Sequence, residues 1–548
     1  MRRPSLATGA LIGFLITAPL SAVLYLANAL AGLAFTPFDA FDWLRDRLPG
    51  RLLIVGIETL AKTLSILGLS VRAASKPAEV IMVIGGFLVF GAVAGLIVFA
   101  AMRMKKVQAG NWAGIILGAA CGLVFSAIGL KIHRGAEGAF TANILWTVAI
   151  FLVWGFAMSL VYGALAKTRR PAVAVQSDPA AVDPLGRRRF LVRIGTASAV
   201  VTVAGTGLAA MLKSRTTMTP TEAPAEGAAQ PQEQTASVAA GRPNAGDRLI
   251  PAAGTRAEYT PVEEHYRIDI DLSPPAIDGK SWALPISGMI NRPTKLTLID
   301  LQTKFEPIHQ YITLECISNE IAGDLIGTTL WTGVSLRKIL DEVGVRDEAK
   351  FLRLEAADGF SETVPLDLIR REERIMFTYA WDRRPLPTAH GFPLRIYIPD
   401  RFGMKQPKWI TKAELIGKDR SGYWVERGWD AVARVRTTSV IDTVAVKDIF
   451  VGPDGNKLVP IGGIAYSGAK GISRVEVKVD GGEWIAAGLR KPLSETTWVI
   501  WRFDWPFEAG SHDFTVRCRE ADGTPQIEKS AGTFPSGATG LHRLRKKI

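Results

Sequence analysis

The chain has 548 residues, of which 48% are hydrophobic, and a formal net charge of +13. One hydrophobic core cannot organise a chain of this length, so several domains are expected. The positive charge is confined to residues 1–215, which hold 22 Lys or Arg against 8 Asp or Glu, whereas residues 216–548 hold 43 against 44. The near-neutral second part excludes a broad basic surface for nucleic acid. The apolar, basic first part is typical of a membrane domain, so the lipid bilayer is an expected partner.

Apolar runs long enough to cross a bilayer recur in the first part of the chain. They predict an all-α transmembrane bundle of about five helices over residues 1–212. The runs lie near residues 8–35, 79–102, 111–130, 139–165 and 190–212.

Basic residues in the short loops predict the orientation of this bundle. Arg2 and Arg3 precede the first run, and clusters of Lys or Arg follow the second and fourth runs. Loops of this kind remain in the cytoplasm. We therefore expect a multi-pass protein of the cell membrane, with a cytoplasmic N-terminus and with everything after residue 212 extracytoplasmic.

The segment 51–71 is apolar but carries Glu58 and Lys62 at helical spacing. An ion pair at this spacing suits a helix that lies in the membrane interface. If the segment spanned the bilayer instead, there would be six helices, and the C-terminal part would fall on the same side as the N-terminus.

A basic motif precedes the last apolar run. Arg187-Arg188-Arg189-Phe190-Leu191 resembles the signal for twin-arginine translocation, and the alternative is a basic cluster that only follows the orientation rule. Its position before the moderately apolar stretch Ile194–Leu212 favours a signal retained as an anchor. Because a haem within the bilayer needs histidine ligands, and His133 is the only histidine in the first 264 residues, the bundle is predicted to be an anchor.

Residues 213–258 are rich in Pro, Ala, Thr, Gln and Gly, with almost no large apolar residue before Leu249. Such a segment cannot bury enough apolar surface to fold, so it is predicted to be a flexible linker. It joins the membrane part to two further predicted domains, residues 259–437 and 438–548.

The chain contains three cysteines, Cys121, Cys316 and Cys518. Cys121 lies in an apolar run, and Cys518 shares a strand face with Phe514 and Val516, so both are predicted to be packing residues. Three cysteines at these spacings form no disulfide framework, zinc cluster or haem-attachment motif. Chemistry at a thiol, if there is any, therefore falls to Cys316.

Cys316 ends an alternating stretch that begins at Tyr311 and predicts a strand with one buried face. The turn-prone Ile317-Ser318-Asn319 follows, and a loop punctuated by glycines is expected before Trp331. A cysteine at a strand end can face a ligand, although on these residues alone a buried packing role is the more common outcome.

A second segment runs from His390 to Thr411, H-G-F-P-L-R-I-Y-I-P-D-R-F-G-M-K-Q-P-K-W-I-T. Alternation places Arg395 and Tyr397 on one strand face, and periodicity alone favours a solvated face for them. Taken with the cysteine segment, however, it resembles the sulfite oxidase family of molybdenum enzymes. The resemblance extends from Tyr266 to the C-terminus.

This resemblance implies an α+β molybdopterin domain over residues 259–437 and one molybdenum–molybdopterin cofactor per chain. Cys316 would be the metal ligand, and nearby cationic side chains would help to ionise its thiol. Arg and Lys side chains suit the phosphate of the pterin. The residues implied to bind the cofactor are Tyr266, Arg267, His390, Arg395, Lys405, Gln406 and Lys408, and those implied to act in catalysis are Cys316, Arg267 and Asn319.

The implied activity is two-electron oxygen-atom transfer on a small oxyanion or on an S-oxide or N-oxide. No haem or iron–sulfur site is expected, so electrons would pass to or from a separate cytochrome, quinone or flavoprotein. Sulfite-oxidising members carry two arginines where this chain has Glu320 and Ile321, which disfavours a dianion unless Arg267, Arg401 or Lys405 compensates. Sulfoxide reductases of the superfamily also lack that arginine pair.

Two other classes of function are weighed against this one. A metal-free extracytoplasmic binding module would not need the residues Cys316, His390, Arg395 and Lys408, so their presence argues against it. A transporter is disfavoured because half of the chain is a non-membrane part and the apolar runs contain few ionisable residues.

The last part of the chain, residues 438–548, is predicted to be all-β. Val475, Val477 and Val479 alternate into Asp480-Gly481-Gly482, which is a hairpin signal. The resemblance implies an immunoglobulin-like β-sandwich of the kind that mediates dimerisation, so a homodimer is an expected assembly.

Overall fold

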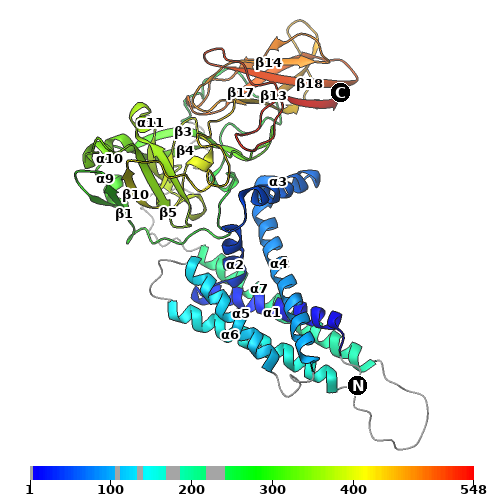
Figure 1. Cartoon of the computed structure of the whole chain (residues 1–548). Helices are drawn as coiled ribbons and strands as arrows, with labels where there is room; N and C mark the ends of the chain where they lie inside the picture. The colour runs from blue at the N-terminus through cyan, green and yellow to red at the C-terminus, as the bar shows by residue number, and fades with distance from the viewer. Residues whose placement is uncertain (1–3, 105–111, 133–139, 168–184, 218–240) are drawn as a thin grey trace, which may run out of the picture. The chain divides into compact units, whose positions relative to one another are not determined.

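The computed structural model describes residues 4–104, 112–132, 140–167, 185–217 and 241–548 (Figure 1). The chain divides into two compact units. The first comprises Met1–Leu48 and Lys76–Ala228, and the second comprises Pro49–Ser75 and Ala229–Ile548.

Long apolar helices make up the first unit. Within the described residues, five helices are long and apolar enough to cross a membrane, as the hydropathy pattern predicts. The motif Arg187–Leu191 lies in the last of them, although the side chains of that motif are outside the described residues. The helices are α1 (Leu6–Ala31), α2 (Thr36–Arg45), α4 (Val71–Met102), α5 (Trp112–Ile132), α6 (Phe140–Lys167) and α7 (Leu185–Thr217), of which α2 is too short to span. The first turn of α4, up to Ser75, belongs to the second unit.

Glycines allow α1 and α4 to cross at close range. A Cβ atom added to Gly13 would lie 2.0 Å from the carbonyl oxygen of Gly91, and one added to Gly95 would lie 2.2 Å from that of Gly9. Glycines also let α5 and α6 pack closely, because a Cβ atom on Gly155 would lie 2.1 Å from the Gly114 carbonyl oxygen. Small residues let helices pack closely in lipid, where water does not drive them together.

The second unit begins with α3 (Gly50–Ile66), which is not among the candidate spans of the described chain. The central part, residues 259–437, is built from two sheets. One has the order β2-β1-β10-β5-β6 with β1 parallel to β10, and the other has the order β3-β4-β7-β8 with β9 paired to β7. Three short helices, α9 (Leu298–Thr303), α10 (Leu336–Val343) and α11 (Leu366–Arg371), complete the part.

The strands of the first of these sheets are β1 (Ala283–Gly288), β2 (Thr294–Thr297), β5 (Phe351–Ala356), β6 (Ser361–Pro365) and β10 (Ile410–Ile416). The strands of the second are β3 (Ile308–Glu315), β4 (Ile326–Ser335), β7 (Met376–Trp381), β8 (Arg384–Pro385) and β9 (Arg395–Tyr397). Side chains from both sheets and from the helices meet in one apolar core. The mixture of strands and helices agrees with the expected α+β class.

Two antiparallel sheets form residues 438–548 and share a core that includes Trp501, Phe514 and Cys518. The Cys518 side chain is buried there, as its strand pattern predicts. The predicted hairpin joins β14 to β15. One sheet contains β11 (Thr438–Val444), β12 (Phe450–Val451), β13 (Lys457–Tyr466), β16 (Gly488–Leu489) and β17 (Val499–Pro506); the other contains β14 (Ile472–Val479), β15 (Ile485–Ala486), β18 (Ser511–Glu520) and β19 (His542–Lys547).

Two expectations need correction. The loop expected between Cys316 and Trp331 is shorter than that interval, because it closes within nine residues and Trp331 lies inside β4, which begins at Ile326. The predicted linker is wrong for residues 241–258, where Arg256 pairs with Asp442 at 2.7 Å and fixes the segment to β11. Residues 218–240 of that linker lie outside the described residues.

The α1–α4 crossing leads to a stability prediction. Gly13→Ala or Gly95→Ala should destabilise the first unit by about 1–3 kcal/mol, because the new methyl group overlaps the backbone of the facing helix. Gly85→Ala is the matched control, since a Cβ atom there meets nothing within 4 Å. Thermal unfolding of the full chain in detergent measures the effect, and equal unfolding temperatures for Gly13→Ala and Gly85→Ala would contradict it.

Candidate functional site

Cys316 lies directly after β3 and is 8% exposed. Its backbone amide donates to the Leu325 carbonyl oxygen at 3.0 Å, and its Sγ lies 3.0 Å from the Ser318 Oγ. The strand end and the returning strand β4 therefore fix the cysteine from both sides.

Asn319 closes the loop that follows the cysteine. Its Nδ2 donates to Glu315 Oε1 at 3.0 Å, and its Oδ1 accepts from the Leu325 amide at 2.9 Å. These bonds join the two ends of the loop across its base. Asn319, predicted as catalytic, is thus placed where it shapes the cysteine loop.

Imidazole and indole rings gather beside the cysteine. His390 lies 4.7 Å from Trp381 and 5.6 Å from His265, measured between ring centroids. His265 stacks on Tyr266 at 5.0 Å, and Tyr266 belongs to the same buried apolar cluster as Cys316. Tyr266 and His390, predicted from distant segments, are therefore brought together with the cysteine.

Arg395 is buried in this group of rings, with 3% of its surface exposed. Its guanidinium carbon lies 4.5 Å from the centre of the Trp331 ring and 5.3 Å from that of Trp381. One of its nitrogens donates to the His390 carbonyl oxygen at 3.0 Å. The solvated face that periodicity alone favours for Arg395 and Tyr397 is wrong, because both side chains are buried when β9 pairs with β7.

Lys408 and Arg267 share one carboxylate. Both side chains form ion pairs with Asp269, whose side chain has no exposed surface. Gly391 brings the lysine close to the buried arginine, because a Cβ atom on Gly391 would lie 3.1 Å from the Lys408 Cβ and 3.2 Å from the Arg395 Cβ. These cations form a basic end of the site, and Asp269 holds two of them in position.

The structure does not bring Lys405 and Gln406 into this group. Lys405 Nζ pairs with Glu362 at 2.7 Å and lines a separate cavity of about 200 Å³. Gln406 Nε2 donates to the carbonyl oxygens of Ile398 and Arg401, at 3.3 and 2.9 Å. Lys405 and Gln406 are close to Lys408 in the sequence but not in the site, because Lys405 ends the short helix Gly403–Lys405 and both side chains are held by other partners.

Burial sets the protonation states of the site. It lowers the pKa of His265 to about 3 and that of His390 to about 2, so both imidazoles are neutral at pH 7. It also lowers the pKa of Arg395 to about 10, which leaves this group charged.

The Cys316 thiol responds to burial in the opposite sense. Its pKa is raised by desolvation, and the hydrogen bonds with Ser318 lower it only in part. Burial also raises the pKa of the neighbouring Glu315 carboxyl group, to about 7. The negative charge of this group, when it is ionised, raises the pKa of the Cys316 thiol further. The expectation that nearby cations ionise this thiol is therefore not met, and binding of a metal ion at sulfur has to displace the proton.

Four buried nitrogen atoms of the site have no hydrogen-bond partner within the described part of the chain. Three of them are donors, Trp331 Nε1, Trp381 Nε1 and Arg395 Nε, and the fourth is His265 Nε2. Buried donors in folded proteins are almost always satisfied, so three in one cluster indicate a ligand rich in hydrogen-bond acceptors. A pterin with a phosphate fits this donor set.

Sequence reasoning missed His265, Asp269, Trp331 and Trp381. A tryptophan in a buried strand has the pattern of an ordinary core residue, and its unpartnered indole nitrogen becomes evident only in three dimensions. His265 carried the clearest signal, because it precedes the predicted Tyr266 directly in the chain.

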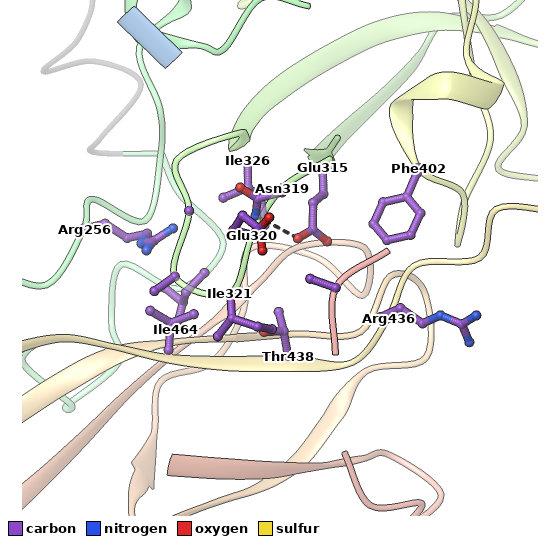
Figure 2. Close-up of a pocket in the computed structure, with 14 residues that line it drawn as sticks. Arg256, Glu315, Asn319, Glu320, Ile321, Ile326, Phe402, Arg436, Thr438 and Ile464 are labelled. Atoms are coloured by element: carbon purple, nitrogen blue, oxygen red, sulfur yellow. Dashed lines mark hydrogen bonds between the residues drawn. The ribbon is translucent and has the colours of Figure 1, made fainter. Parts of the chain in front are cut away.

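A pocket separates the cysteine loop from β11 and β13 (Figure 2). Its free space is about 10 Å³, roughly what one water molecule needs. Figure 2 shows Glu320 and Ile321 on the loop side and Thr438 and Ile464 on the other side. Arg256 also lines it and is paired with Asp442.

Comparison with known proteins agrees with this geometry. Residues 271–424 match the model of the oxidoreductase molybdopterin binding domain. Sulfite oxidase of Gallus gallus is 26% identical over 301 residues, which cover 47% of this chain and 65% of that protein. Nitrate reductase [NAD(P)H] of Hordeum vulgare is 25% identical over 317 residues, which cover 46% of this chain and 35% of that protein.

The chain thus spans between one third and two thirds of the length of these relatives. Among solved structures, the sulfane dehydrogenase SoxCD of Paracoccus pantotrophus matches with a TM-score of 0.46 and 19% identity, over 60% of this chain and 94% of that one. The domain match and the two groups of relatives show that residues 271–424 form a molybdopterin-binding oxidoreductase domain similar to those of sulfite oxidases and nitrate reductases.

Proposed function

We propose that this chain is a membrane-anchored enzyme that transfers an oxygen atom to or from an uncharged S-oxide or N-oxide substrate, with molybdenum–molybdopterin as its cofactor. The observation that carries the proposal is the convergence of Cys316, His390 and Arg395 on one buried cluster with unsatisfied donors. A metal-free binding module would leave those donors without a partner, at a cost of about 1–3 kcal/mol for each.

The site divides into a metal end and a phosphate end. Cys316 would supply the thiolate that holds molybdenum. The indole nitrogens of Trp331 and Trp381 and the guanidinium of Arg395 would donate to the pterin, and Lys408 would bind its phosphate. The neutral imidazole of His390 adds no charge to the pocket, so its potential is set by the cations Arg395, Arg267 and Lys408 and by the carboxylate of Asp269. When bound, the cofactor supplies the two-electron exchange of an oxygen atom.

Charge around the cysteine loop supports an uncharged substrate over a dianion. Glu320 is exposed and Ile321 is half-buried, at the two positions where sulfite-oxidising members carry arginines. An acidic and an apolar side chain there repel or fail to bind a dianion. The cations that could compensate are each held in an ion pair: Arg267 with Asp269, Lys405 with Glu362, and Arg401 with Asp400.

The remaining parts of the chain fit this activity. The apolar helices would anchor the enzyme in the cell membrane, with a cytoplasmic N-terminus and an extracytoplasmic site. The fifth of them would retain a twin-arginine signal. A separate cytochrome, quinone or flavoprotein would exchange electrons with the enzyme. The two-sheet C-terminal part would be an immunoglobulin-like sandwich that supports a homodimer.

The metal assignment has a direct test. The wild-type chain, purified with its cofactor, should contain about one molybdenum atom per chain, and Cys316→Ser should lose most of it because the thiolate ligand is gone. Cys518→Ser is the control, since Cys518 is buried in the C-terminal core. Elemental analysis gives the result, and a fully loaded Cys316→Ser protein would overturn the assignment.

The two lysines of the second segment should behave differently. Lys408→Gln should lower the pterin content by removing a phosphate-binding cation. Lys405→Met should instead lower the free energy of unfolding by about 3 kcal/mol, because Glu362 is left buried without its partner. The double variant Lys405→Met/Glu362→Gln should recover part of that loss. Urea unfolding and pterin analysis on the same samples separate the roles, and loss of pterin in Lys405→Met alone would contradict them.

Substrate charge can be tested through the exposed Glu320. The wild type should reduce methyl phenyl sulfoxide, with reduced viologen as donor, at a kcat/KM about tenfold above that for sulfite oxidation by ferricyanide. Glu320→Arg should raise the kcat/KM for sulfite about tenfold by attracting the dianion. Glu342→Arg, on the exposed face of α10, controls for the change in net charge. A wild type that prefers sulfite would refute the uncharged substrate.

A further inference from the structure

The cysteine loop contacts a segment that the sequence places among the membrane helices. Pro49–Ser75 belongs to the second compact unit. Ile54 of α3 is 5% exposed and packs in one apolar cluster with Ile317 and Ile326, which flank the cysteine loop. A Cβ atom on Gly50 would lie 2.5 Å from the Arg427 carbonyl oxygen, so the start of α3 also lies against the domain.

Asp324, near the end of the cysteine loop, binds the beginning of α4. Its carboxylate accepts a hydrogen bond from the Ser70 hydroxyl and, at 3.1 Å, one from the Arg72 amide. Ser70 precedes α4 and accepts from the Ala73 amide at 3.2 Å, which is the bond of an N-cap residue. The first amides of a helix have no partner within it and form its positive end, so a carboxylate is stabilised there.

The same turn of helix touches the metal end of the site. Val71, the first residue of α4, packs against the buried cluster that contains Cys316, Tyr266 and Leu325. The loop itself includes Ala322 at a φ of 66°, a conformation that residues with a Cβ atom disfavour. A loop in this conformation needs contacts from outside to hold its shape.

We propose that Asp324, Ser70 and the first turn of α4 form a clamp that positions the Cys316 loop. Ser70 and Asp324 are then positioning residues for the metal ligand, although neither contacts the reacting atoms. The segment between the first and second apolar spans becomes part of the catalytic site. The proposal rests on the proposed role of Cys316, and it extends that site to residues outside the matched domain.

The clamp makes a prediction that does not need the metal. In the cofactor-free full-length chain in lipid nanodiscs, Cys316 is buried and should react slowly with iodoacetamide. Ser70→Ala and Asp324→Ala should each speed its alkylation about five- to tenfold, as expected for loss of an N-cap bond or of a carboxylate at a helix N-terminus. Ser70→Thr keeps the hydroxyl group and should restore the slow rate.

Mass spectrometry of each cysteine peptide supplies the controls. Cys518 should keep its rate in every variant, and Asp341→Asn, which removes an exposed acid on α10, should leave Cys316 unchanged. If Asp324→Ala also exposes Cys518, the protein has unfolded more widely, and the milder Ser70→Ala and Asp324→Asn decide the question. Equal Cys316 rates in the wild type and in both milder variants would overturn the clamp.

A second measurement on loaded protein separates the clamp from the proposed function. The electron paramagnetic resonance signal of molybdenum(V) should shift in Ser70→Ala and return in Ser70→Thr, because the geometry at sulfur changes. If Cys316→Ser retains molybdenum, the proposed function fails, while the alkylation rates still report on the loop. If Cys316→Ser loses molybdenum and the alkylation rates do not respond to Ser70 or Asp324, only the clamp fails.

Discussion

A guanidinium group withdrawn from water must find acceptors, and this requirement organises the site. Arg395 is 3% exposed, and in the described chain only one of its hydrogen bonds, to the His390 carbonyl oxygen, is satisfied, with Nε left unpartnered. The faces of Trp331 and Trp381 stabilise its charge. Keeping a cation in this setting is costly unless a polar ligand completes its bonds, which is the strongest physical reason to expect an anionic cofactor here.

Acidic side chains partly neutralise the cations of the site, which limits nonspecific binding of anions. Asp269 holds Arg267 and Lys408 together, and Glu362 neutralises Lys405. A net positive charge remains where the phosphate of a pterin would bind, because Arg267, Lys408 and Arg395 outnumber the single carboxylate of Asp269. Toward the loop, Glu320 adds a negative charge. An uncharged substrate near the metal and an anionic cofactor beyond it are compatible with the same set of side chains.

The cysteine loop shows how distant segments share the control of one side chain. Asn319 joins the ends of the loop, Ile54 packs beside it, and Asp324 binds the start of α4. The loop is therefore held by residues outside the catalytic segment as well as by its own strands. In the first unit a different constraint applies, because glycines let α1 and α4 approach until their backbones touch.

The sequence by itself determined the local features: the five apolar helices, the strand that ends near Cys316 and the set His390, Arg395 and Lys408. These depend on periodicity, length and motif, which neighbouring residues carry. Tertiary structure alone decided that Arg395 is buried, that Lys405 belongs to Glu362 and that Asp324 meets α4. Burial and ion pairing depend on which segments meet in space. The sequence pattern of a strand cannot supply this information, because the alternation of side chains is identical whether a face of the strand contacts water or lines a ligand pocket.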